Sequence, residues 1–443
     1  MKTTIEELYD IFLKYPGICT DTRKLQQGDL FFALKGDRFN GNLFAKTALD
    51  AGAAFAIIDD PTLADEPGMI WVDDTLKCLQ DLAHHHRSQL DIPIIALTGS
   101  NGKTTTKELM AVVMGSHYPL QYTKGNLNNH IGVPLSLLSI GPDAEVAIIE
   151  MGANHQGEID ALCRIAAPTH GLVTNIGKAH LEGFGGEEGV RKGKSELFRY
   201  LEETGGVAFV NLSEPHLLAL SEGVNKRIFY KQDEVCRNTG PFYAVRLVEA
   251  NPFVVAEFLG ENSQPLQINS ELIGQYNFSN IMTAIVIGWY FKVPGDQIKS
   301  AIESYVPANN RSQLLHLGSN TLILDAYNAN PSSMQQALMA LKVMKGEKKM
   351  AILGDMLELG QESENAHQEI AQLANELLLV NLVLVGPHFA EIAHTLNLKH
   401  FEDATALGTW FQEQVFEDTL ILLKGSRGMA LEKILPKENA GKH

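Results

Sequence analysis

The sequence predicts an α/β protein with three domains. Its 443 residues are more than one ordinary hydrophobic core accommodates. Short apolar runs that end in polar or Gly residues alternate with stretches of helical spacing, a pattern typical of parallel sheets covered by helices. We place the domains at residues 1–91, 92–306 and 307–443, with a doubly wound parallel sheet in the second and a smaller, Rossmann-like α/β unit in the third.

The first block contains two predicted strands, "GDLFFALKG" (28–36) and "AAFAIIDD" (53–60), whose apolar runs are bounded by Gly and Asp. A loop and a helical stretch separate them. The segment "TLKCLQDLAHHHRSQL" (75–90) has apolar residues at helical spacing. Its three consecutive histidines cannot share one helical face, so we expect solvated helix surface there rather than a metal site.

The second and third blocks repeat the strand pattern. Predicted strands are "IPIIALT", "AEVAIIEMG" and "HGLVTNIG" in the second block, and "TLILDAYNA", "KKMAILGDM", "LVNLVLVGP" and "TLILLKGS" in the third. In the second block, a Gly-rich loop, Glu150 and Asn175 follow the strand ends. Ligands bind at the carboxyl ends of parallel strands, so this edge is the predicted site.

Composition restricts the class of protein. Lys and Arg number 36 against 53 Asp and Glu, a net charge of −17, which argues against a broad basic face for nucleic acid. No signal-peptide core opens the chain and nowhere do about 18 apolar residues run together, so we expect a cytoplasmic protein without membrane insertion. The four cysteines are far apart, which favours reduced, buried thiols.

The stretch "TGSNGKTT" (98–105) has the form of a phosphate-binding loop between a strand and a helix. Gly99 and Gly102 would let the backbone approach phosphate oxygens, Lys103 would reach the β- and γ-phosphates, and Thr104 would ligate magnesium. The common pattern places a Gly at position 97, where this chain has Leu97, so the loop is a variant.

Three further residues favour a metal-dependent nucleotide site. Glu150 ends the apolar run "VAIIE", as an acidic metal ligand does at the end of a buried strand. His180 and Lys194 follow soon after. Alone, such a histidine is more often structural and such a lysine more often a surface charge, but their proximity in sequence to the loop favours function. The nearby "GFGGEEG" (183–189) lacks the third glycine of a dinucleotide fingerprint, so we discount it.

These motifs resemble the Mur ligase family, ATP-dependent enzymes that form amide bonds in bacterial cell-wall synthesis. The variant loop matches, and longer similar stretches span all three blocks: "DTRKLQQGDLFFALKGDRFNG", "GNLNNHIGVPLSLL", "EMGANHQGEI", "TNIGKAHLEGFG", "DAYNANPSSM", "LGDMLELG" and "LKGSRGMALE". They resemble the members that add D-alanyl-D-alanine to UDP-N-acetylmuramoyl-tripeptide. The third residue of that tripeptide is either diaminopimelate or lysine.

The resemblance implies roles for individual residues. Thr104 and Glu150 would hold one magnesium ion and His180 would help hold a second. Lys194 stands where the family has a lysine carbamylated by carbon dioxide, which replaces a repelling ammonium with an anionic oxygen donor. Lys103, Lys194, His180 and Arg311 are the implied catalytic residues. The implied ATP-binding residues are Gly99, Ser100, Asn101, Gly102, Lys103, Thr104 and Thr105 in the loop, Asn277 and Asn280 at the adenine, Arg311 at the γ-phosphate and Asp325 at the ribose.

The first block resembles a uridine-nucleotide-binding domain. The implied substrate-binding residues are Thr22, Arg23, Asp37, Arg38, Phe39 and Asn40 in this block, Asn126, Asn128 and Asn129 in the second, and Asn328 and Asn330 in the third. The family commonly has Gly-His where this chain has Gly41-Asn42. By analogy with the family we expect a monomer.

The implied reaction begins with attack of the tripeptide carboxylate on the γ-phosphate, giving an acyl phosphate that the dipeptide amine then displaces. We expect a hinge near residues 304–312 to close the third domain over the nucleotide. One alternative is a sister ligase that adds a single amino acid such as diaminopimelate or lysine. The chain lacks the D-N-P-R motif common in those enzymes. The other alternative is a non-catalytic phosphate-loop protein, which would need no second metal cluster.

Overall fold

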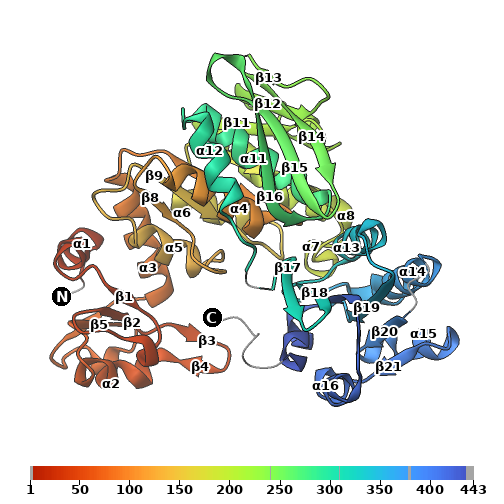
Figure 1. The fold of residues 1–443 in the computed structure, drawn as a ribbon. Coiled ribbons are helices and arrows are strands. Elements are labelled where there is room, and N and C mark those ends of the chain that lie inside the picture. Colours follow the sequence, from red (N-terminus) through yellow and green to blue (C-terminus); the bar gives the residue numbers. More distant parts are fainter. Residues whose placement is uncertain (1–2, 240, 309, 378–380, 436–443) are drawn as a thin grey trace.

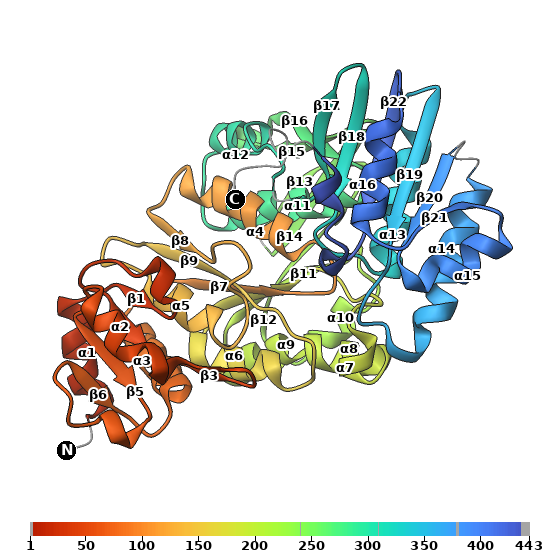
Figure 2. The same ribbon diagram turned by 90° about the horizontal axis from the view of Figure 1, so that it is seen from below.

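The computed structural model describes residues 3–239, 241–308, 310–377 and 381–435, which form three successive α/β domains (Figure 1). The N-terminal and C-terminal domains lie at opposite ends of the molecule, with the central domain between them (Figure 2). None of the described helices is long and apolar enough to cross a membrane.

The N-terminal domain is a parallel sheet with strand order β1-β2-β5-β6 and a separate β3–β4 hairpin. Thr4 and Glu7 form a capping box that begins the first helix. The elements are α1 (Ile5–Lys14), β1 (Ile18–Cys19), η1 (Thr22–Lys24), β2 (Leu30–Phe32), β3 (Lys35–Gly36), β4 (Phe39–Asn40), η2 (Gly41–Phe44), α2 (Ala45–Asp50), β5 (Phe55–Ile58), η3 (Pro61–Leu63), β6 (Met69–Trp71) and α3 (Thr75–Ser88).

The central sheet has the order β16-β15-β14-β12-β11-β10-β7-β9-β8. From β8 to β14 its strands pair in parallel, as expected for a doubly wound sheet. Its strands are β7 (Ile94–Thr98), β8 (Leu120–Tyr122), β9 (Val146–Glu150), β10 (His170–Val173), β11 (Val207–Asn211), β12 (Lys226–Gln232), β13 (Arg237–Asn238), β14 (Phe242–Ala250), β15 (Phe253–Leu259) and β16 (Pro265–Ile273).

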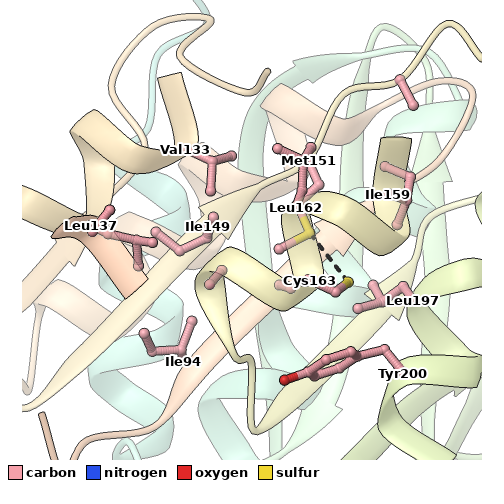
Figure 3. Close-up of a cluster of buried hydrophobic side chains, with 14 of the residues drawn as sticks. Ile94, Val133, Leu137, Ile149, Met151, Ile159, Leu162, Cys163, Leu197 and Tyr200 are labelled. Carbon is pink, nitrogen blue, oxygen red and sulfur yellow. Dashed lines mark hydrogen bonds between the residues drawn. The ribbon is translucent and has the colours of Figure 1, made fainter. Parts of the chain in front are cut away.

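Helices cover both faces of this sheet. The α4 and α11 helices pack against one another on one face, and α5, α6 and α9 belong to the core on the other. The helices are α4 (Lys103–Gly115), α5 (Gly132–Leu138), α6 (Glu158–Ala166), α7 (Leu181–Phe184), α8 (Glu187–Lys194), α9 (Glu196–Thr204), α10 (Leu217–Leu220), η4 (Glu261–Ser263), α11 (Tyr276–Tyr290) and α12 (Gly295–Glu303). Figure 3 shows part of the core that contains α5, α6 and α9, where Met151 contacts Cys163 beside Leu162.

One edge of the central sheet differs from the predicted parallel arrangement. Strands β14, β15 and β16 pair antiparallel as a meander. Buried and half-buried residues alternate along β15, which is the pattern of an antiparallel strand with one covered face.

The C-terminal domain has the strand order β17-β18-β22-β19-β20-β21, parallel except for the β17–β18 pair. Separate apolar cores lie on its two faces. The elements are β17 (Gln313–Leu317), β18 (Asn320–Asp325), α13 (Pro331–Val343), β19 (Lys348–Gly354), η5 (Gly360–Glu362), α14 (Ser363–Glu376), β20 (Asn381–Val385), η6 (Pro387–Phe389), α15 (Ala390–Thr395), β21 (Lys399–Phe401), α16 (Ala404–Glu413), β22 (Thr419–Lys424), η7 (Arg427–Met429) and η8 (Leu431–Ile434).

The predicted strands of all three blocks correspond to strands of the structure. The first two residues of "LVNLVLVGP", 379–380, lie outside the described residues. The exact domain boundaries stay a prediction.

The expectation of a solvated histidine triplet is wrong for one of its members. His84 is exposed, but His86 is buried between α1 and the central domain. Its Nε2 lies 2.9 Å from the carbonyl oxygen of Ile140, and its Nδ1 lies 3.2 Å from the Tyr9 hydroxyl. Burial lowers the pKa of this imidazole. His86 is therefore a packed, neutral residue that joins two domains.

Candidate active site

A cleft of about 1250 Å³ lies between the central and C-terminal domains. It brings together most of the residues predicted for ATP and metal binding. The predicted residues that line it are Ser100, Asn101, Gly102, Lys103, Thr104, Thr105, Asn128, Asn129, Glu150, His180, Asn277, Asn280, Arg311, Asp325, Asn328 and Asn330.

The phosphate loop connects β7 to α4, and two glycines determine its path. Gly99 and Gly102 have φ angles of 146° and 75°. A Cβ on Gly99 would lie 2.0 Å from the Thr174 hydroxyl, and one on Gly102 would lie 2.6 Å from the Asn280 side chain. Neither position admits a side chain. Leu97, which replaces the usual first glycine, is fully buried within β7, so the chain turns two residues later than in the common loop.

Neighbouring segments hold the loop in place. The Asn101 amide N–H donates to Asn175 Oδ1 at 2.9 Å, and the Thr174 hydroxyl donates to the Asn101 carbonyl at 2.7 Å. Lys103 Nζ donates to the Gly99 carbonyl at 2.6 Å. Burial lowers the pKa of Lys103 to about 8, and the nearby charge of Arg311 acts in the same direction. Both cations line the cleft.

Glu150 lies at the end of β9, buried, beside the loop. Its Oε1 accepts hydrogen bonds from the Thr104 hydroxyl at 3.2 Å and from Asn128 Nδ2 at 2.7 Å. Its buried Oε2 has no hydrogen-bond partner among the described residues and lies 3.8 Å from Nζ of the fully buried Lys107. A buried carboxylate oxygen with no donor beside a threonine hydroxyl fits a divalent cation.

His180 joins the two domains that form the cleft. Its Nδ1 lies 2.5 Å from Oε2 of Glu358, which belongs to the C-terminal domain. The hydrogen bond from His180 lowers the pKa of Glu358. With Nδ1 held by a carboxylate, Nε2 is the nitrogen available to a metal, the arrangement common for metal-binding histidines.

Lys194, at the end of α8, is fully buried and does not line the cleft. Its Nζ donates to the carbonyl of Ala153 at 3.1 Å and lies 5.0 Å from the centre of the Phe184 ring. Within the described residues no carboxylate forms an ion pair with it. Burial, with the charge of Lys103 as a smaller cause, lowers its pKa well below 10.5. A buried neutral amine fits the chemistry of carbamylation.

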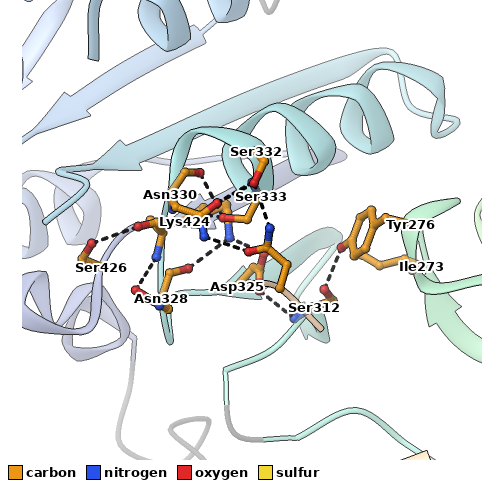
Figure 4. A network of polar contacts seen from close by, with 12 residues as sticks. Ile273, Tyr276, Ser312, Asp325, Asn328, Asn330, Ser332, Ser333, Lys424 and Ser426 are labelled. Atoms are coloured by element: carbon orange, nitrogen blue, oxygen red, sulfur yellow. Dashed lines mark hydrogen bonds and ion pairs between the residues drawn. The ribbon is translucent and has the colours of Figure 1, made fainter. Parts of the chain in front are cut away.

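Arg311, Asp325 and Lys424 form the C-terminal wall (Figure 4 shows the last two). The Arg311 guanidinium lies 3.8 Å from the centre of the Tyr327 ring, and its buried Nε has no hydrogen-bond partner in the part of the chain that the structure describes. Asp325 accepts from Lys424 Nζ at 2.7 Å and from the Ser312 amide at 3.2 Å. The unpartnered Arg311 nitrogen fits an anionic ligand such as phosphate.

The predicted adenine-side residues also serve the fold. Asn277 Nδ2 donates to the Ile273 carbonyl, and Asn280 Nδ2 donates to Asn277 Oδ1, both at 2.8 Å. Asn280 in turn accepts from the Thr106 hydroxyl at 3.0 Å. These bonds fasten α11 to α4 and leave each amide with part of its hydrogen-bonding capacity.

The asparagines of the second block are placed differently from one another. Asn128 contacts Glu150, as described. The Asn129 side chain accepts from the Ile131 and Gly132 amides, which begins α5. Asn126 is exposed and does not line the cleft.

A polar contact joins the phosphate loop to the start of α13. Asn330 Nδ2 donates to Asn101 Oδ1 at 2.7 Å, and Asn101 Nδ2 donates to Ser332 Oγ at 2.8 Å. Asn330 Oδ1 also accepts from the Ser333 amide, so the same side chain caps the helix. Asn328 Oδ1 bonds the adjacent Ala329 amide.

None of the residues predicted in the N-terminal domain lines this cleft. Gln80 of α3 is the residue through which that domain reaches it. Thr22 and Arg23 lie in η1, where Arg23 is exposed and pairs with Asp21. The other predicted residues of this domain, Asp37, Arg38, Phe39 and Asn40, lie in and around the β3–β4 hairpin.

Asn42 shows what replaces the family's histidine. It is buried, and its side chain bonds Asn40 and both the carboxylate and the amide of Asp59. Asn42 therefore stabilises the loop from inside.

Several residues that contact predicted site residues were not themselves predicted, among them Lys107, Tyr327, Glu358 and Lys424. Three of them lie inside motifs that the sequence did single out, "DAYNANPSSM", "LGDMLELG" and "LKGSRGMALE", so the motifs were the available indication.

A phosphate loop that faces a second α/β domain, with an arginine of that domain whose Nε has no hydrogen-bond partner among the described residues, is the arrangement of an ATP-dependent enzyme of several domains. Models of the Mur ligase family match the chain in three parts: the family's catalytic domain at residues 14–87, the Mur ligase middle domain at 97–288, and the Mur ligase glutamate ligase domain at 310–427. The chain belongs to the Mur ligase family.

Relatives match it along nearly its whole length. The UDP-N-acetylmuramoyl-tripeptide--D-alanyl-D-alanine ligase of Bacillus subtilis is 35% identical, with 95% of this chain and 92% of that protein covered. The enzyme of that name from Escherichia coli is 34% identical, with 98% of each covered. A crystal structure of MurF from Acinetobacter baumannii superimposes with a TM-score of 0.83 at 32% identity, covering 94% and 92% of the chains. MurF from Thermotoga maritima in complex with ADP gives 0.82 at 26% identity, covering 95% and 96%.

Proposed function

We propose that this enzyme uses ATP to join D-alanyl-D-alanine to UDP-N-acetylmuramoyl-tripeptide. The observation that carries the proposal is the match along the whole chain to ligases of that name. The cleft supports it, because it combines a phosphate loop, a buried carboxylate with a free oxygen and an arginine from the opposite domain.

The residues at the phosphate end have distinct roles. Lys103 and Arg311, already close to each other, would neutralise the γ-phosphate as the tripeptide carboxylate attacks it. Asp325, held by Lys424, would accept a hydrogen bond from a ribose hydroxyl. Asn277, with Asn280 behind it, would contact the adenine.

Thr104 and Glu150 would hold one magnesium ion, and His180, oriented by Glu358, would help hold a second. Within the described residues, no three His, Cys, Asp or Glu side chains form a metal site by themselves. The protein therefore supplies few ligands per ion, as is usual for magnesium bound with a nucleotide. Bound magnesium would withdraw charge from the phosphates and orient their oxygens.

Lys194 would be carbamylated. Its neutral amine attacks carbon dioxide, forms a C–N bond and releases one proton, which leaves an anionic carboxylate at the buried position. This change places a negative charge in the neighbourhood of Lys103. Carbamylated Lys194 would thus favour cation binding beside the loop.

The reaction has two steps. A carboxylate oxygen of the tripeptide forms a bond to the γ-phosphorus, and the bond to ADP breaks, giving an acyl phosphate. The dipeptide amine then attacks the acyl carbon, loses a proton and expels inorganic phosphate. Asn128 and Asn129 from the central domain and Asn328 from the C-terminal domain would position the reacting ends, with Asn126 at the margin.

The N-terminal domain would hold the UDP end of the tripeptide substrate. Its proposed contacts are Thr22, Arg23, Asp37, Arg38, Phe39 and Asn40, and the enzyme would act as a monomer. Because this domain packs onto the central domain through α3, substrate bound there would keep a fixed relation to the phosphate loop.

The test is phosphate release from ATP with UDP-N-acetylmuramoyl-tripeptide and a panel of amines. We expect release coupled to amide formation with D-alanyl-D-alanine and not with D-glutamate, L-lysine or diaminopimelate. Activity with another amine would assign the chain to a sister ligase. Nucleotide binding without amide formation would leave a non-catalytic phosphate-loop protein.

A further inference from the structure

Two arginines share one tyrosine on the wall of the cleft. Residues 307–443 contain two arginines, Arg311 and Arg427. Their guanidinium carbons lie 3.8 and 5.0 Å from the centre of the Tyr327 ring. The distance between the two guanidinium carbons therefore cannot exceed the sum of these two distances. A cation over an aromatic face is attracted to it, so Tyr327 holds both at the cleft.

The two arginines are not equivalent. Arg311 lines the cleft and lies close enough to Lys103 to help lower the pKa of that lysine, which places Arg311 at the phosphate end. Arg427 is exposed, and among the described residues no carboxylate forms an ion pair with it. Lys424, the other cation of this wall, is already paired with Asp325 at 2.7 Å. Arg427 is thus a cation beside the cleft that the mechanism does not use.

The backbone at Arg427 is firmly held. The preceding residue, Ser426, is buried, and its hydroxyl accepts from the Leu357 amide at 2.9 Å. The Ser426 amide donates to the Asp355 carbonyl at 3.1 Å. Arg427 therefore follows a junction between β22 and the segment after β19, where hydrogen bonds of Ser426 hold the backbone.

If the proposed function holds, the incoming dipeptide carries a carboxylate that takes no part in the reaction. This group is charged before and after the amide forms, so it requires a cation other than those at the phosphates. A dipeptide spans about 7 Å when extended, so its carboxylate lies roughly that far from its amine. The guanidinium carbon of Arg427 lies at most about 9 Å from that of Arg311 at the phosphate end, which matches this span once the hydrogen bond to the carboxylate is added.

We propose that Arg427 binds the free carboxylate of the D-alanyl-D-alanine acceptor and thereby selects a dipeptide of the correct length. The planar guanidinium can donate two parallel hydrogen bonds to a carboxylate, which lysine cannot do. An acceptor that lacks this carboxylate loses the contact. A single amino acid, whose carboxylate lies one residue closer to the reacting amine, loses it as well.

The experiment compares D-alanyl-D-alanine with its C-terminal amide as acceptors for the wild type and for Arg427→Met, with ATP and UDP-tripeptide saturating. We expect the wild type to prefer the acid by roughly 10- to 100-fold in kcat/KM, the range of a charged hydrogen bond. Arg427→Met should raise KM for the acid and abolish the preference, while kcat/KM for the amide stays within about 2-fold of wild type. Arg427→Lys should retain part of the preference.

Lys433→Met, which removes an exposed cation from the following turn, is the matched control and should keep the full preference. The inference is overturned if the wild type shows no preference. It is also overturned if Arg427→Met keeps the preference while KM for ATP rises, which would assign Arg427 to phosphate binding. A third contrary result is an equal loss of kcat/KM with both acceptors together with a lower unfolding temperature of the variant. Failure of the wild type to form any amide would instead contradict the proposed function.

Discussion

Lys194 is the residue whose surroundings most constrain its chemistry. A fully buried ammonium beside a phenylalanine ring, with one carbonyl as its partner, is costly, so the neutral amine is favoured. Lys194→Ala should lower turnover by roughly 10- to 100-fold or more, as loss of a group that supports a metal does. Short carboxylic acids added to the variant should restore part of it.

The control for this variant is Lys192→Ala, which removes an exposed lysine from the same helix and should have no effect. Measurement is the steady-state rate with and without added acetate or formate. Unchanged turnover in Lys194→Ala would remove this residue from the mechanism.

Glu214 lines the cleft, and the pH dependence of stability tests whether its carboxyl is buried there. Burial raises the pKa of this half-buried carboxyl from 4.5 to about 7. Between these pH values the folded protein binds more protons than the unfolded chain, so this group lowers stability as pH rises through the window. Relative to wild type, Glu214→Gln should therefore gain about 1–2 kcal/mol of unfolding free energy between pH 4 and pH 8. The gain is smaller than the full pKa shift implies, because solvent screens part of the effect.

Urea unfolding at pH 4, 6 and 8 measures this difference. The exposed Glu222→Gln is the control, and its difference from wild type should not depend on pH in this way. A pH-independent difference for Glu214→Gln would show that the carboxyl is solvated.

At the scale of elements, the first turn of α13 is both capped and joined to the phosphate loop by one side chain. Asn330 caps the helix and also donates to Asn101 of the phosphate loop. Asn330→Ser should keep the cap but lose the contact with Asn101, whereas Asn330→Ala should lose both. We expect both variants to raise KM for ATP similarly, and Asn330→Ala alone to lose about 1 kcal/mol of unfolding free energy.

Urea unfolding and ATP kinetics on the two variants separate these roles. An equal loss of stability in both would show that serine does not cap this helix, and an unchanged KM for ATP would show that the contact with the loop has no role in binding.

The predicted strands were accurate where apolar runs end at polar residues, as in β7, β9 and β22. The β14–β16 meander and the β3–β4 hairpin were not predicted, because pairing between adjacent strands depends on the sheet edge available to them rather than on composition. The motifs singled out the loop at 98–105, Glu150 and Arg311, which the structure brings to one cleft. They did not reveal that Lys424 holds Asp325, or that Glu358 meets His180 from another domain, since such contacts exist only after the domains pack.

At the scale of the molecule, the two outer domains are attached differently. The N-terminal and central domains share one apolar core, which includes Leu82 of α3 and Ile94 of β7. The C-terminal domain has its own two cores and reaches the central domain through Ile273 and the polar contacts of His180 and Asn101. Relative motion is therefore expected at the C-terminal domain, whose connection runs through residues 304–312. Residue 309 of this hinge lies outside the described residues.

Small-angle scattering should show a smaller radius of gyration when a non-hydrolysable ATP analogue and the UDP-tripeptide bind together. Glu358→Gln, which removes the charge from the contact with His180, should reduce this compaction. No compaction in the wild type would count against the hinge, and an equal response in the variant would count against the role of Glu358.

The most direct test of the account follows oxygen from the tripeptide into phosphate. UDP-N-acetylmuramoyl-tripeptide labelled with ¹⁸O in its terminal carboxylate is incubated with the enzyme, ATP and D-alanyl-D-alanine, and both products are examined by mass spectrometry. The account predicts one ¹⁸O in the inorganic phosphate for each amide formed. Amide formed together with unlabelled phosphate would contradict it. Labelled phosphate formed equally well without the dipeptide would also contradict it.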